Sequence, residues 1–465
     1  MDFKAFDAPK KKFGSLAAPK GLTKETAQAF LEEHDVSYVL AQFVDIHGVA
    51  KSKAVPASHL EDVITDGAGF AGAGAWGLGL KPHESEYMVR CDLNTLTITP
   101  WRPNTAAMMG VGLVEGRWHE YDTRNILRTQ LVRLAERGWT LNTGLEPEFI
   151  LFKKSGDGEL IPFDSTDTLS KAAYDYRGLS RGRDFIEPLV ESLQAVGVDV
   201  YQIDHEDANG QYEINFKYDE ALKTADQITF FKMAAAEIAN DLDAICTFMP
   251  KPKTTSTGNG MHIHCSMANE QGDNIFHDPD DKRGMGLSKL AYQFMAGILA
   301  HAPALTALLA PTVNSYKRLV VGNTVSGATW APVFIAYGDN NRTAMVRVPY
   351  GRLELRVGDS AMNPYLATAA MVAAGLDGIE KDLDPGEPHN LNFYDLSPRQ
   401  IEELGIKTLP QNLNDALKAL EDDPLFANVL GQGIVSEFIK IKQDEWSEYH
   451  RSVSDWEVNR YLNFY

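Results

Sequence analysis

The sequence predicts an α+β protein in which a small N-terminal domain precedes a much larger domain of mixed strands and helices. The first observation is a hairpin pattern, in which the apolar alternation of residues 37–44 is followed by DIHG and then VAKSKAVP. The second is that segments of period two and segments of helical period alternate between residues 139 and 380. The third is length, because 465 residues are too many for one small domain and can bury a large core.

The chain divides into three predicted parts. Residues 1–21 carry three consecutive lysines with proline and glycine and have no periodicity, so we predict a flexible arm. Residues 22–120 form the predicted N-terminal domain, whose first helix begins with Thr23 as its N-cap. Residues 121–465 form the predicted large domain, which opens with an amphipathic helix that ends at Gly138.

A glycine-rich segment, GAGFAGAGAWGLG at 67–79, contains the spacing G-x-G-x-x-G twice. In a dinucleotide-binding fold this motif follows a strand and opens a helix. Here it follows a predicted helix and no helical pattern comes after it. We therefore predict a loop that approaches a ligand, and no dinucleotide site.

The elements of the large domain are predicted from their periods. The strand-like segments are 139–152, 198–204, 211–217, 261–267, 332–337, 345–348 and 353–357. The helical segments are 184–196, 224–246, 287–301 and 364–380. From the start signal Ser397-Pro398 with Gln400 onward, through the run at 434–450, the chain is predicted to be helical.

Composition excludes several classes of protein. The formal net charge of −20 argues against a nucleic-acid-binding surface. The three cysteines are widely spaced and fit neither a zinc site nor a disulfide framework, so we expect the reducing cytoplasm. The N-terminus lacks the apolar core of a secretory signal. The longest apolar run, 296–313, contains a histidine and two prolines, so we expect a soluble protein with a buried helix there and no membrane span.

The stretch TSTGNGMHIHCS at 255–266 is the first candidate for a functional site. Its two glycines, Gly258 and Gly260, free the backbone to turn and to approach a ligand closely. On the strand that follows, His262 and His264 point to one face. Two imidazoles on one face suit a metal or a phosphate, although a half-solvated strand would also explain them.

Carboxylates occur in the neighbouring strand-like segments. LEPEF holds Glu146 and Glu148 two residues apart, HEDANGQYEINF adds Glu206 and Glu213, and RLELRVGD adds Glu354. Like charges on one face repel, so a fold that keeps them close needs a cation. Five carboxylates with one imidazole suit Mg²⁺ or Mn²⁺ and not structural zinc. Ion-paired or solvated strand faces remain the alternative for each segment.

Arginines complete the pattern, and they are Arg318, Arg342, Arg347, Arg352 and Arg356. Arginines beside divalent cations hold phosphates and neutralise developing charge in phosphoryl transfer. Surface salt bridging is the alternative for any single one of them.

These strings occur in an order that resembles the glutamine synthetase family. The motifs are LEPEF, EDANGQYE, GNGMHIH, NSYKR, NRTAMVR and GRLELR followed by DSAMNPYLATAAMVAAGLDGI, and the resemblance runs from about residue 35 to the end. It implies a β-grasp-like N-terminal domain and a catalytic domain with an open, curved sheet. It also implies a homo-oligomer, a dodecamer of two hexameric rings, in which two subunits share each active site.

The resemblance implies a role for each site residue. For two divalent cations, the ligands are Glu148, Glu206 and Glu213 at the first and Glu146, His262 and Glu354 at the second. The matched substrate contacts are His264, Ser266 and Arg352 for ATP and Gly258, Arg318 and Arg356 for glutamate, while Arg342 and Arg347 stabilise phosphate. Asp45 matches an aspartate that reaches the neighbouring subunit's site and helps to deprotonate ammonium.

The implied reaction uses ATP as cosubstrate and two or more Mg²⁺ or Mn²⁺ ions per site. The glutamate γ-carboxylate attacks the γ-phosphorus of ATP, and an amine then opens the acyl phosphate to give a γ-glutamyl amide. The amine reacts only when unprotonated, so a negative group must accept its proton.

The sequence departs from the family around the amine. Typical members carry P-G-Y-E-A-P after NSYKR, whereas residues 321–332 read VGNTVSGATWAP, with Trp330 where the glutamate would fall. An indole accepts no proton, but it offers an apolar wall and a cation–π face to an alkylammonium. A packing aromatic at a subunit edge is the alternative for Trp330. Thr257 also stands where many relatives have asparagine.

HEDANGQYE and SGATWAP most resemble the branch of γ-glutamylmethylamide synthetases and GlnT proteins. The leading hypothesis is therefore ligation of glutamate to methylamine. A glutamine synthetase that uses ammonia, with Asp45 alone accepting the proton, is the alternative. A non-catalytic scaffold is a third, against which the six metal-position residues argue. The sequence leaves the amine and the preferred metal open, and we expect Tyr394, in NFYDLSP, to be an ordinary loop tyrosine.

Overall fold

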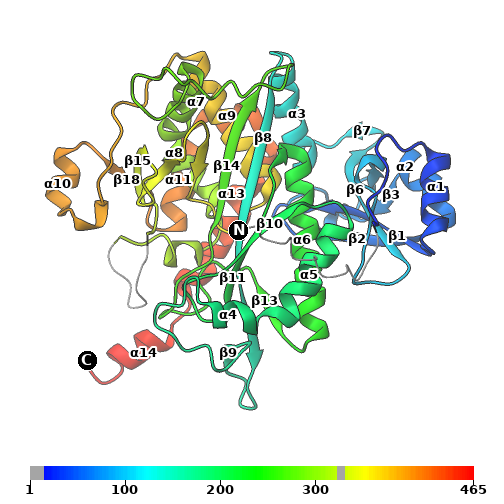
Figure 1. The fold of residues 1–465 in the computed structure, drawn as a ribbon, viewed down its shortest axis with the longest axis horizontal. Helices are drawn as coiled ribbons and strands as arrows, with labels where there is room; N and C mark the ends of the chain where they lie inside the picture. The colour runs from blue at the N-terminus through cyan, green and yellow to red at the C-terminus, as the bar shows by residue number, and fades with distance from the viewer. Residues whose placement is uncertain (1–14, 322–329) are drawn as a thin grey trace, which may run out of the picture.

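The protein is described by a computed structural model that covers residues 15–321 and 330–465. Two β-sheets organise the chain, one of seven strands near the N-terminus and one of eleven strands in the remainder. Figure 1 shows the first sheet at one side of the molecule and the long strands of the second sheet running through its centre. This is the α+β architecture that the sequence predicts.

The N-terminal sheet has the strand order β2-β1-β6-β4-β3, with β5 and β7 paired to β6. Its strands are β1 Tyr38–Val44, β2 Ala50–Pro56, β3 Ala68–Phe70, β4 Tyr87–Cys91, β5 Thr97–Ile98, β6 Thr105–Val114 and β7 Arg117–Trp118. The predicted hairpin is confirmed as the antiparallel pair β1–β2, and β1 runs parallel to β6. Two helices, α1 Lys24–Glu33 and α2 Leu60–Thr65, bury Leu31 and Leu60 in one core with β1 and β6, which makes the arrangement β-grasp-like.

The second sheet has the order β10-β11-β8-β14-β17-β16-β15-β18, and β9, β12 and β13 pair with β8. Its strands are β8 Thr140–Lys154, β9 Leu160–Pro162, β10 Val200–His205, β11 Gln211–Phe216, β12 Asp219–Glu220, β13 Ile245–Thr247, β14 Met261–Ala268, β15 Phe334–Asp339, β16 Ala344–Val348, β17 Leu353–Leu355 and β18 Lys407–Thr408. The long strands β8 and β14 are antiparallel neighbours, so segments more than 100 residues apart in the chain lie side by side.

Helices cover this sheet. They are α3 Thr123–Ala135, α4 Tyr176–Arg181, α5 Arg183–Ala195, α6 Ala221–Asp241, α7 Lys289–Ala300, α8 Ala302–Leu309, α9 Pro364–Glu380, α10 Pro398–Glu403, α11 Leu413–Asp422, α12 Pro424–Leu430, α13 Gln432–Arg451 and α14 Asp455–Tyr461. Helix α9 is buried on almost every side, because α3, α6, α7, α8 and α12 all pack against it. The apolar faces of β8 and β14 share one continuous core with these helices.

Polar contacts join the N-terminal sheet to the larger part. The buried Arg124 at the start of α3 lies 2.8 Å from Asp226 on α6 and 3.2 Å from Asp92 of the N-terminal part. The side chain of Asn363 donates a hydrogen bond of 2.8 Å to the carbonyl oxygen of Asp45. A buried arginine held by two carboxylates resists separation, because breaking the pair would leave an uncompensated buried charge.

Two predictions from the sequence were wrong in detail. The helix predicted for 224–246 ends as α6 at Asp241, because the chain turns at Asp243, whose φ is +51°, and then pairs with β8 as β13. The glycine-rich loop contains β3, which pairs with β4. Gly67 makes this possible, because it has a φ of +94° and a Cβ there would lie 2.9 Å from the carbonyl carbon of Val89.

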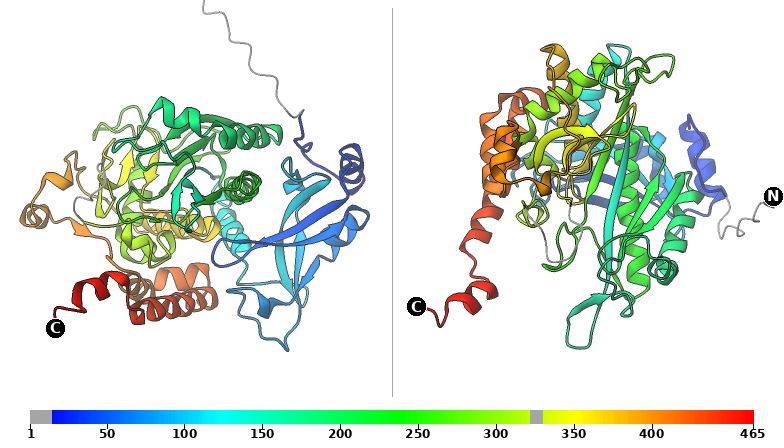
Figure 2. Two further views of the ribbon diagram at one scale, coloured as in Figure 1. Left: turned by 90° about the horizontal axis from the view of Figure 1, so that it is seen from below. Right: turned by 60° about the vertical axis from the view of Figure 1, so that its left-hand side comes forward.

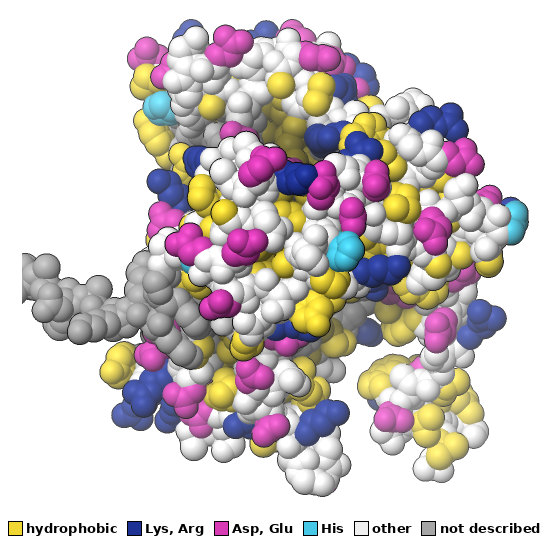
Figure 3. All heavy atoms as spheres, turned by 90° about the vertical axis from the view of Figure 1, so that its right-hand side faces the viewer, with side chains coloured by type: hydrophobic (Ala, Val, Ile, Leu, Met, Phe, Trp, Pro, Cys, Tyr) yellow, Lys and Arg dark blue, Asp and Glu magenta, His cyan; other side chains and the backbone are white. Residues whose placement is uncertain are grey.

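The C-terminal helices leave the body of the molecule. Figures 1 and 2 show α14 projecting from it beyond the end of α13. Several large apolar side chains of this segment are exposed, namely Val453, Trp456, Leu462, Phe464 and Tyr465. On the face that carries the N-terminal sheet, acidic, basic and hydrophobic side chains are interspersed (Figure 3).

The predicted buried helix in the longest apolar run is confirmed, because α7 and α8 lie almost entirely in the core. No single helix among the described residues is long and apolar enough to cross a membrane. The criteria of length and hydropathy are met only by α7 and α8 taken together, and these two helices are bent by 79°.

Candidate active site

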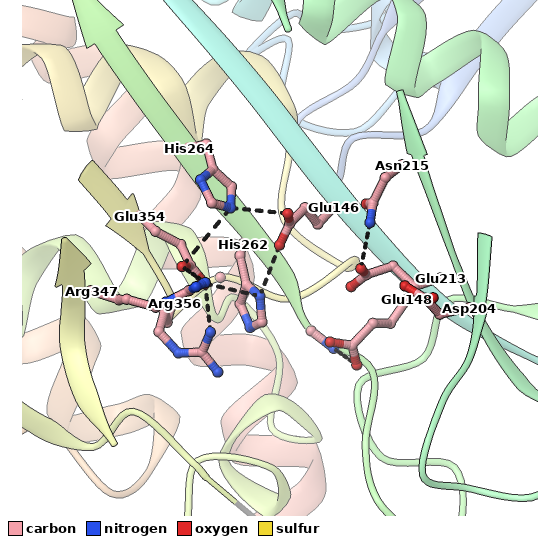
Figure 4. A network of polar contacts seen from close by, with 12 residues as sticks. Glu146, Glu148, Asp204, Glu213, Asn215, His262, His264, Arg347, Glu354 and Arg356 are labelled. Atoms are coloured by element: carbon pink, nitrogen blue, oxygen red, sulfur yellow. Dashed lines mark hydrogen bonds and ion pairs between the residues drawn. The ribbon is translucent and has the colours of Figure 1, made fainter. Parts of the chain in front are cut away.

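The register of the second sheet brings the predicted site residues into one row. On β14, His262 lies opposite Glu146 of β8, and His264 lies opposite Glu354 of β17. Glu354 in turn lies opposite Arg347 of β16. Because side chains alternate along each strand, all of these groups point to the same face of the sheet (Figure 4). We call this group the β14 half of the site. It consists of Glu146, His262, His264 and Glu354 with the two arginines that contact Glu354, Arg347 and Arg356.

The row continues on the other side of β8. Glu213 of β11 lies opposite Glu148 of β8 and also opposite Asp204 of β10. Glu206 follows the end of β10, where its backbone N–H donates to the carbonyl of Gln211 at 2.9 Å. We call Glu148, Asp204, Glu206 and Glu213 the β11 half. Glu146 and Glu148 share β8, so the two halves adjoin.

Strong ion pairs hold the β14 half. Glu354 is fully buried, and its two oxygens lie 2.5 Å from Arg347 Nη1 and 2.5 Å from Arg356 Nη1. Burial alone would raise the pKa of Glu354, but Arg356, the two imidazoles and Arg347 lower it to about 2. Burial would likewise raise the pKa of Glu146, yet the neighbouring imidazoles of His262 and His264 hold it well below its usual range. Both carboxylates of the β14 half are therefore ionised at neutral pH.

The tautomer of His264 follows from its neighbours. Arg352 Nε donates to His264 Nδ1 at 3.2 Å, so Nδ1 is the acceptor of the ring. His264 Nε2 lies 3.0 Å from Glu146 Oε1 and therefore carries the proton. His264 thus links the arginine to the carboxylate on β8.

The β11 half has the opposite electrostatics. Burial and then the charges of Glu148 and Asp204 raise the pKa of Glu206 to about 8. Burial and the charges of Glu146, Glu148 and Glu206 raise the pKa of Glu213 well above its ordinary value. The donors recorded for these carboxylates are neutral groups, such as Asn215 Nδ2 at 2.8 Å from Glu213 Oε1. This half therefore gains its full charge only when a cation offsets the repulsion.

The donor atoms fit divalent cations. Ligand atoms of Glu146, His262 and Glu354 all lie within 4.8 Å of one another. His262 Nδ1 is 3.5 Å from Glu146 and 3.6 Å from Glu354, distances that are long for hydrogen bonds. Carboxylate oxygens with one imidazole form a donor set for Mg²⁺ or Mn²⁺. The β11 half, with carboxylates only, offers hard oxygen donors for a second such ion.

The glycine turn before β14 lies against both halves. The Gly260 backbone N–H donates to Glu148 Oε2 at 2.8 Å, and a Cβ at Gly260 would lie 3.2 Å from His262 Nε2. A Cβ at Gly258 would lie 2.3 Å from the Pro250 carbonyl and 3.1 Å from Cγ of Arg318. Glycine is therefore required at Gly258, and the turn brings its backbone beside the buried Arg318.

A cavity of about 380 Å³ opens beside the β14 half. His264, Ser266 and Arg352, the three residues predicted to contact ATP, all line it together with Glu146. Its other walls carry aromatic side chains, namely Tyr201, Phe216, Tyr218 and Tyr350. A cavity with aromatic walls and a few charged groups at one end suits a nucleotide whose phosphates face the carboxylate row.

Asp45 does not join the row. It is 1% exposed, and its Oδ1 accepts hydrogen bonds of 3.0 Å from the backbone N–H groups of His47 and Val49. Its Oδ2 lies 3.2 Å from Lys51. These contacts stabilise the turn between β1 and β2, so a role in accepting a proton from an amine stays a prediction.

Trp330 and Arg342 lie outside the carboxylate row. Most of the divergent segment, residues 322–329, lies outside the described residues. Trp330 is 52% exposed, and the carbonyl of the next residue, Ala331, accepts a hydrogen bond of 2.5 Å from Tyr394. Arg342 is exposed in the turn between β15 and β16.

Sequence reasoning missed four residues of the site. Asp204 and Tyr201 project from β10, where Tyr201 lines the cavity, and the backbone N–H of Tyr174 donates to the His205 carbonyl at 2.8 Å. Gln211 donates through Nε2 to Glu148 at 3.2 Å and to the Gly258 carbonyl at 3.0 Å. Two of them had a signal. Asp204 precedes Glu206 by two residues at the end of a strand, and Gln211 stands within the motif EDANGQYE.

Comparison with known proteins agrees with this geometry. The family described as "Glutamine synthetase, catalytic domain" matches residues 120–461. A glutamate–methylamine ligase of Methyloversatilis universalis is 56% identical over 445 residues, which cover 96% of this chain and 100% of that protein. A glutamine synthetase of Halobacterium salinarum is 40% identical and covers 93% of this chain and 95% of its own length.

Solved structures match the whole fold. A structure described as "GmaS/ADP complex-Conformation 1" superposes with a TM-score of 0.88 at 41% identity and covers 94% of this chain and 99% of its own. A structure described as "Apo GmaS without ligand" has a TM-score of 0.86 at 40% identity, with the same coverage. The agreement extends over both sheets and the helices around them.

Proposed function

The chain belongs to the glutamine synthetase family, and we propose that it joins the γ-carboxylate of glutamate to methylamine with the conversion of ATP to ADP and phosphate. The observation that carries the ligase reaction is the carboxylate row, with its imidazole and arginines, beside the cavity that His264, Ser266 and Arg352 line. The choice of methylamine is supported by 56% identity over almost the whole chain to a glutamate–methylamine ligase.

The reaction proceeds in two steps. An oxygen of the γ-carboxylate attacks the γ-phosphorus of ATP, the bond from that phosphorus to the bridging oxygen breaks, and ADP leaves. The amine nitrogen then attacks the carbonyl carbon of the acyl phosphate, phosphate leaves, and the nitrogen loses one proton. Bound Mg²⁺ or Mn²⁺ ions would neutralise the phosphate oxygens, with ligands in both halves of the row.

The chain's own residues orient the two anionic substrates. His264, Ser266 and Arg352 are proposed to hold ATP in the cavity, with its phosphates toward the row. The proposed glutamate position lies along Gly258, Arg318 and Arg356, where a glycine backbone and two buried arginines adjoin the cation ligands. Arg342 and Arg347 are proposed to stabilise the transferred phosphoryl group. Glu354 supports this role by fixing the guanidinium of Arg347.

The amine would be recognised away from the row. We propose that Trp330 provides an apolar wall and a cation–π face for methylammonium, which its exposed indole at the end of the divergent segment supports. Asp45 remains the proposed proton acceptor. Since its carboxylate is engaged in its own turn, it would have to exchange Lys51 or a turn hydrogen bond for the ammonium group.

We propose a homo-oligomer, a dodecamer of two hexameric rings, in the cytoplasm. The exposed apolar side chains around α14 support association, because water-exposed groups such as Trp456 and Phe464 gain by burial in a neighbour. The proposed domain limits are 22–120 and 121–465, with residues 1–21 as an arm, of which 1–14 lie outside the described residues.

Steady-state kinetics with an amine panel test this function. The purified chain, supplied with glutamate, ATP and Mg²⁺ or Mn²⁺, should give kcat/KM for methylamine at least about tenfold above that for ammonia, which corresponds to about 1.4 kcal/mol of discrimination. A preference for ammonia would instead identify a glutamine synthetase, the second candidate, to which the 40% identical Halobacterium protein points. Absence of amine-dependent ADP formation would overturn both and leave a scaffold.

A further inference from the structure

A buried ion pair stands directly behind the β11 half. His205 Nε2 lies 2.8 Å from Asp167 Oδ2, and both side chains are almost completely shielded from solvent. His205 Nδ1 faces the carbonyl oxygen of Glu206 at 2.7 Å, so this nitrogen must donate. Both ring nitrogens therefore face hydrogen-bond acceptors, and the imidazole is held between a carboxylate and the backbone.

The pair holds both ends of the short loop between β10 and β11. At its start, the imidazole binds the backbone of Glu206. At its end, the backbone N–H of Gly210 donates to Asp167 Oδ2 at 2.7 Å, and Asn209 Nδ2 donates to Asp167 Oδ1 at 3.1 Å. The loop 206–210 joins two carboxylates of the row, Glu206 and Glu213.

The imidazole is also fixed by tight packing. A Cβ at Gly178, in α4, would lie 2.4 Å from Cδ2 of His205, and the ring of Tyr212 lies 5.1 Å away in an edge-to-face arrangement. The carbonyl of His205 accepts a hydrogen bond of 2.8 Å from the N–H of Tyr174. The segment before α4 is therefore bound to the loop at several points, and the imidazole has no room to turn.

We propose that Asp167 and His205 are positioning residues that hold Glu206 and Glu213 together as ligands for one divalent cation. This inference rests on the proposed function, because it takes the β11 half as a cation site. The physical reason is repulsion: without a cation, the carboxylates of this half push one another apart. A backbone fixed on both sides of Glu206 keeps them converged, so less reorganisation is needed when the cation binds.

The test measures cation affinity directly, by calorimetric titration of the metal-free protein with Mn²⁺. Asp167→Asn keeps the shape of the side chain but removes its charge, and His205→Gln removes the imidazole ring. Each variant should weaken the affinity of one class of Mn²⁺ site by about 10- to 100-fold, the usual effect of changing a group behind a metal ligand. At saturating Mn²⁺, kcat should recover, and KM for glutamate should stay within about twofold of the wild type.

The chain offers a matched control far from the row. His301 lies 2.9 Å from Asp377 and 2.6 Å from Asp423, so it too is an imidazole held by carboxylates. His301→Gln should lower the free energy of unfolding in the same range as His205→Gln while leaving the Mn²⁺ titration unchanged. If both variants weakened Mn²⁺ equally, the effect would be general destabilisation and the proposal would be wrong.

If Asp167→Asn fails to fold, a milder variant, Asn209→Ala, can be tested in its place. Asn209→Ala removes one hydrogen bond to Asp167 and one to the Leu169 carbonyl. It should weaken Mn²⁺ binding by about threefold, since a hydrogen bond contributes about 0.5–1.5 kcal/mol. Unchanged affinity in folded variants of Asp167 and His205 overturns the positioning role alone, because wild-type ligase activity would persist. A wild-type protein that binds no Mn²⁺ would overturn the proposed function as well.

Discussion

The two halves of the carboxylate row are built from the same residue type but have opposite electrostatics. In the β14 half, Glu146 and Glu354 face two imidazoles and two arginines, and their pKa values are lowered. In the β11 half, Glu206 and Glu213 face one another and Glu148, and their pKa values are raised. The difference lies in whether the fold supplies the compensating cations itself.

This contrast separates two functions within one row. In the β14 half, arginines of the protein itself compensate the carboxylate charge of Glu354. These side chains therefore stay in place whether or not a substrate is bound. The carboxylates of the β11 half repel one another, so the proposed binding of a cation there would be linked to proton release. A rigid arginine frame thus adjoins a proposed cation site whose charge would change with its ligand.

Among the substitutions considered for the two halves, that of Glu354 should have the largest effect on stability and activity. Glu354→Gln leaves Arg347 and Arg356 buried without their partner, so the free energy of unfolding should fall by about 3–5 kcal/mol. Ligase activity should fall by more than about 100-fold, because a proposed cation ligand and an arginine frame are lost together. Chemical unfolding in EDTA and steady-state kinetics measure the two effects.

The same substitution in the β11 half should have the opposite effect on stability. Glu213→Gln removes a repelling carboxylate, so the metal-free protein should gain on the order of 1 kcal/mol. Mn²⁺ binding and activity should still be lost. Should Glu213→Gln destabilise the metal-free protein as strongly as Glu354→Gln does, the proposed division into two halves would fail.

The pH dependence of the metal-free protein should follow from Glu206. Between its ordinary value of 4.5 and its folded value of about 8, the folded protein keeps a proton that the unfolded chain has lost. The contribution of Glu206 to the free energy of unfolding therefore falls as pH rises through this window. Glu206→Gln should reduce that fall, and Glu213, whose pKa is also raised, accounts for the remainder. Glu354 acts in the opposite sense, because its contribution is present above 4.5 and is lost as pH falls toward 2.

Cation affinity should rise with pH in the same window, because Mn²⁺ must displace the proton. Calorimetric titration at pH 7 in two buffers of different ionisation enthalpy would detect the released proton. Equal apparent enthalpies in the two buffers would show that no proton leaves, and the raised pKa of Glu206 would then not govern binding.

The smallest effect is expected outside the row, at Trp330. Trp330→Leu should raise KM for methylamine by about 3- to 30-fold, the range of about 0.5–2 kcal/mol for a cation–π contact, and leave KM for glutamate unchanged. Trp118→Leu is the matched control, because Trp118 is similarly exposed but lies in β7 of the N-terminal sheet. An unchanged preference among amines would identify Trp330 as a packing aromatic.

Much of the site was predictable because its signals are local. Alternation along LEPEF, MHIHCS and RLELR determines which side chains share a face, and this follows from the two-residue period of any strand. The glycines at Gly258 and Gly260 likewise indicated a close backbone approach, which the clash at a hypothetical Cβ explains.

The sequence by itself determined the residue types, the faces and the family, whereas the tertiary structure decided which charges meet. Register between distant strands places Glu354 beside Arg347 and Glu213 beside other carboxylates, and no local pattern encodes that choice. The ion pair of Asp167 and His205 spans 38 residues and was equally invisible. Desolvation and charge pairing depend on which groups are neighbours in space. For that reason glutamates in the β14 half have lowered pKa values, whereas glutamates in the β11 half have raised ones.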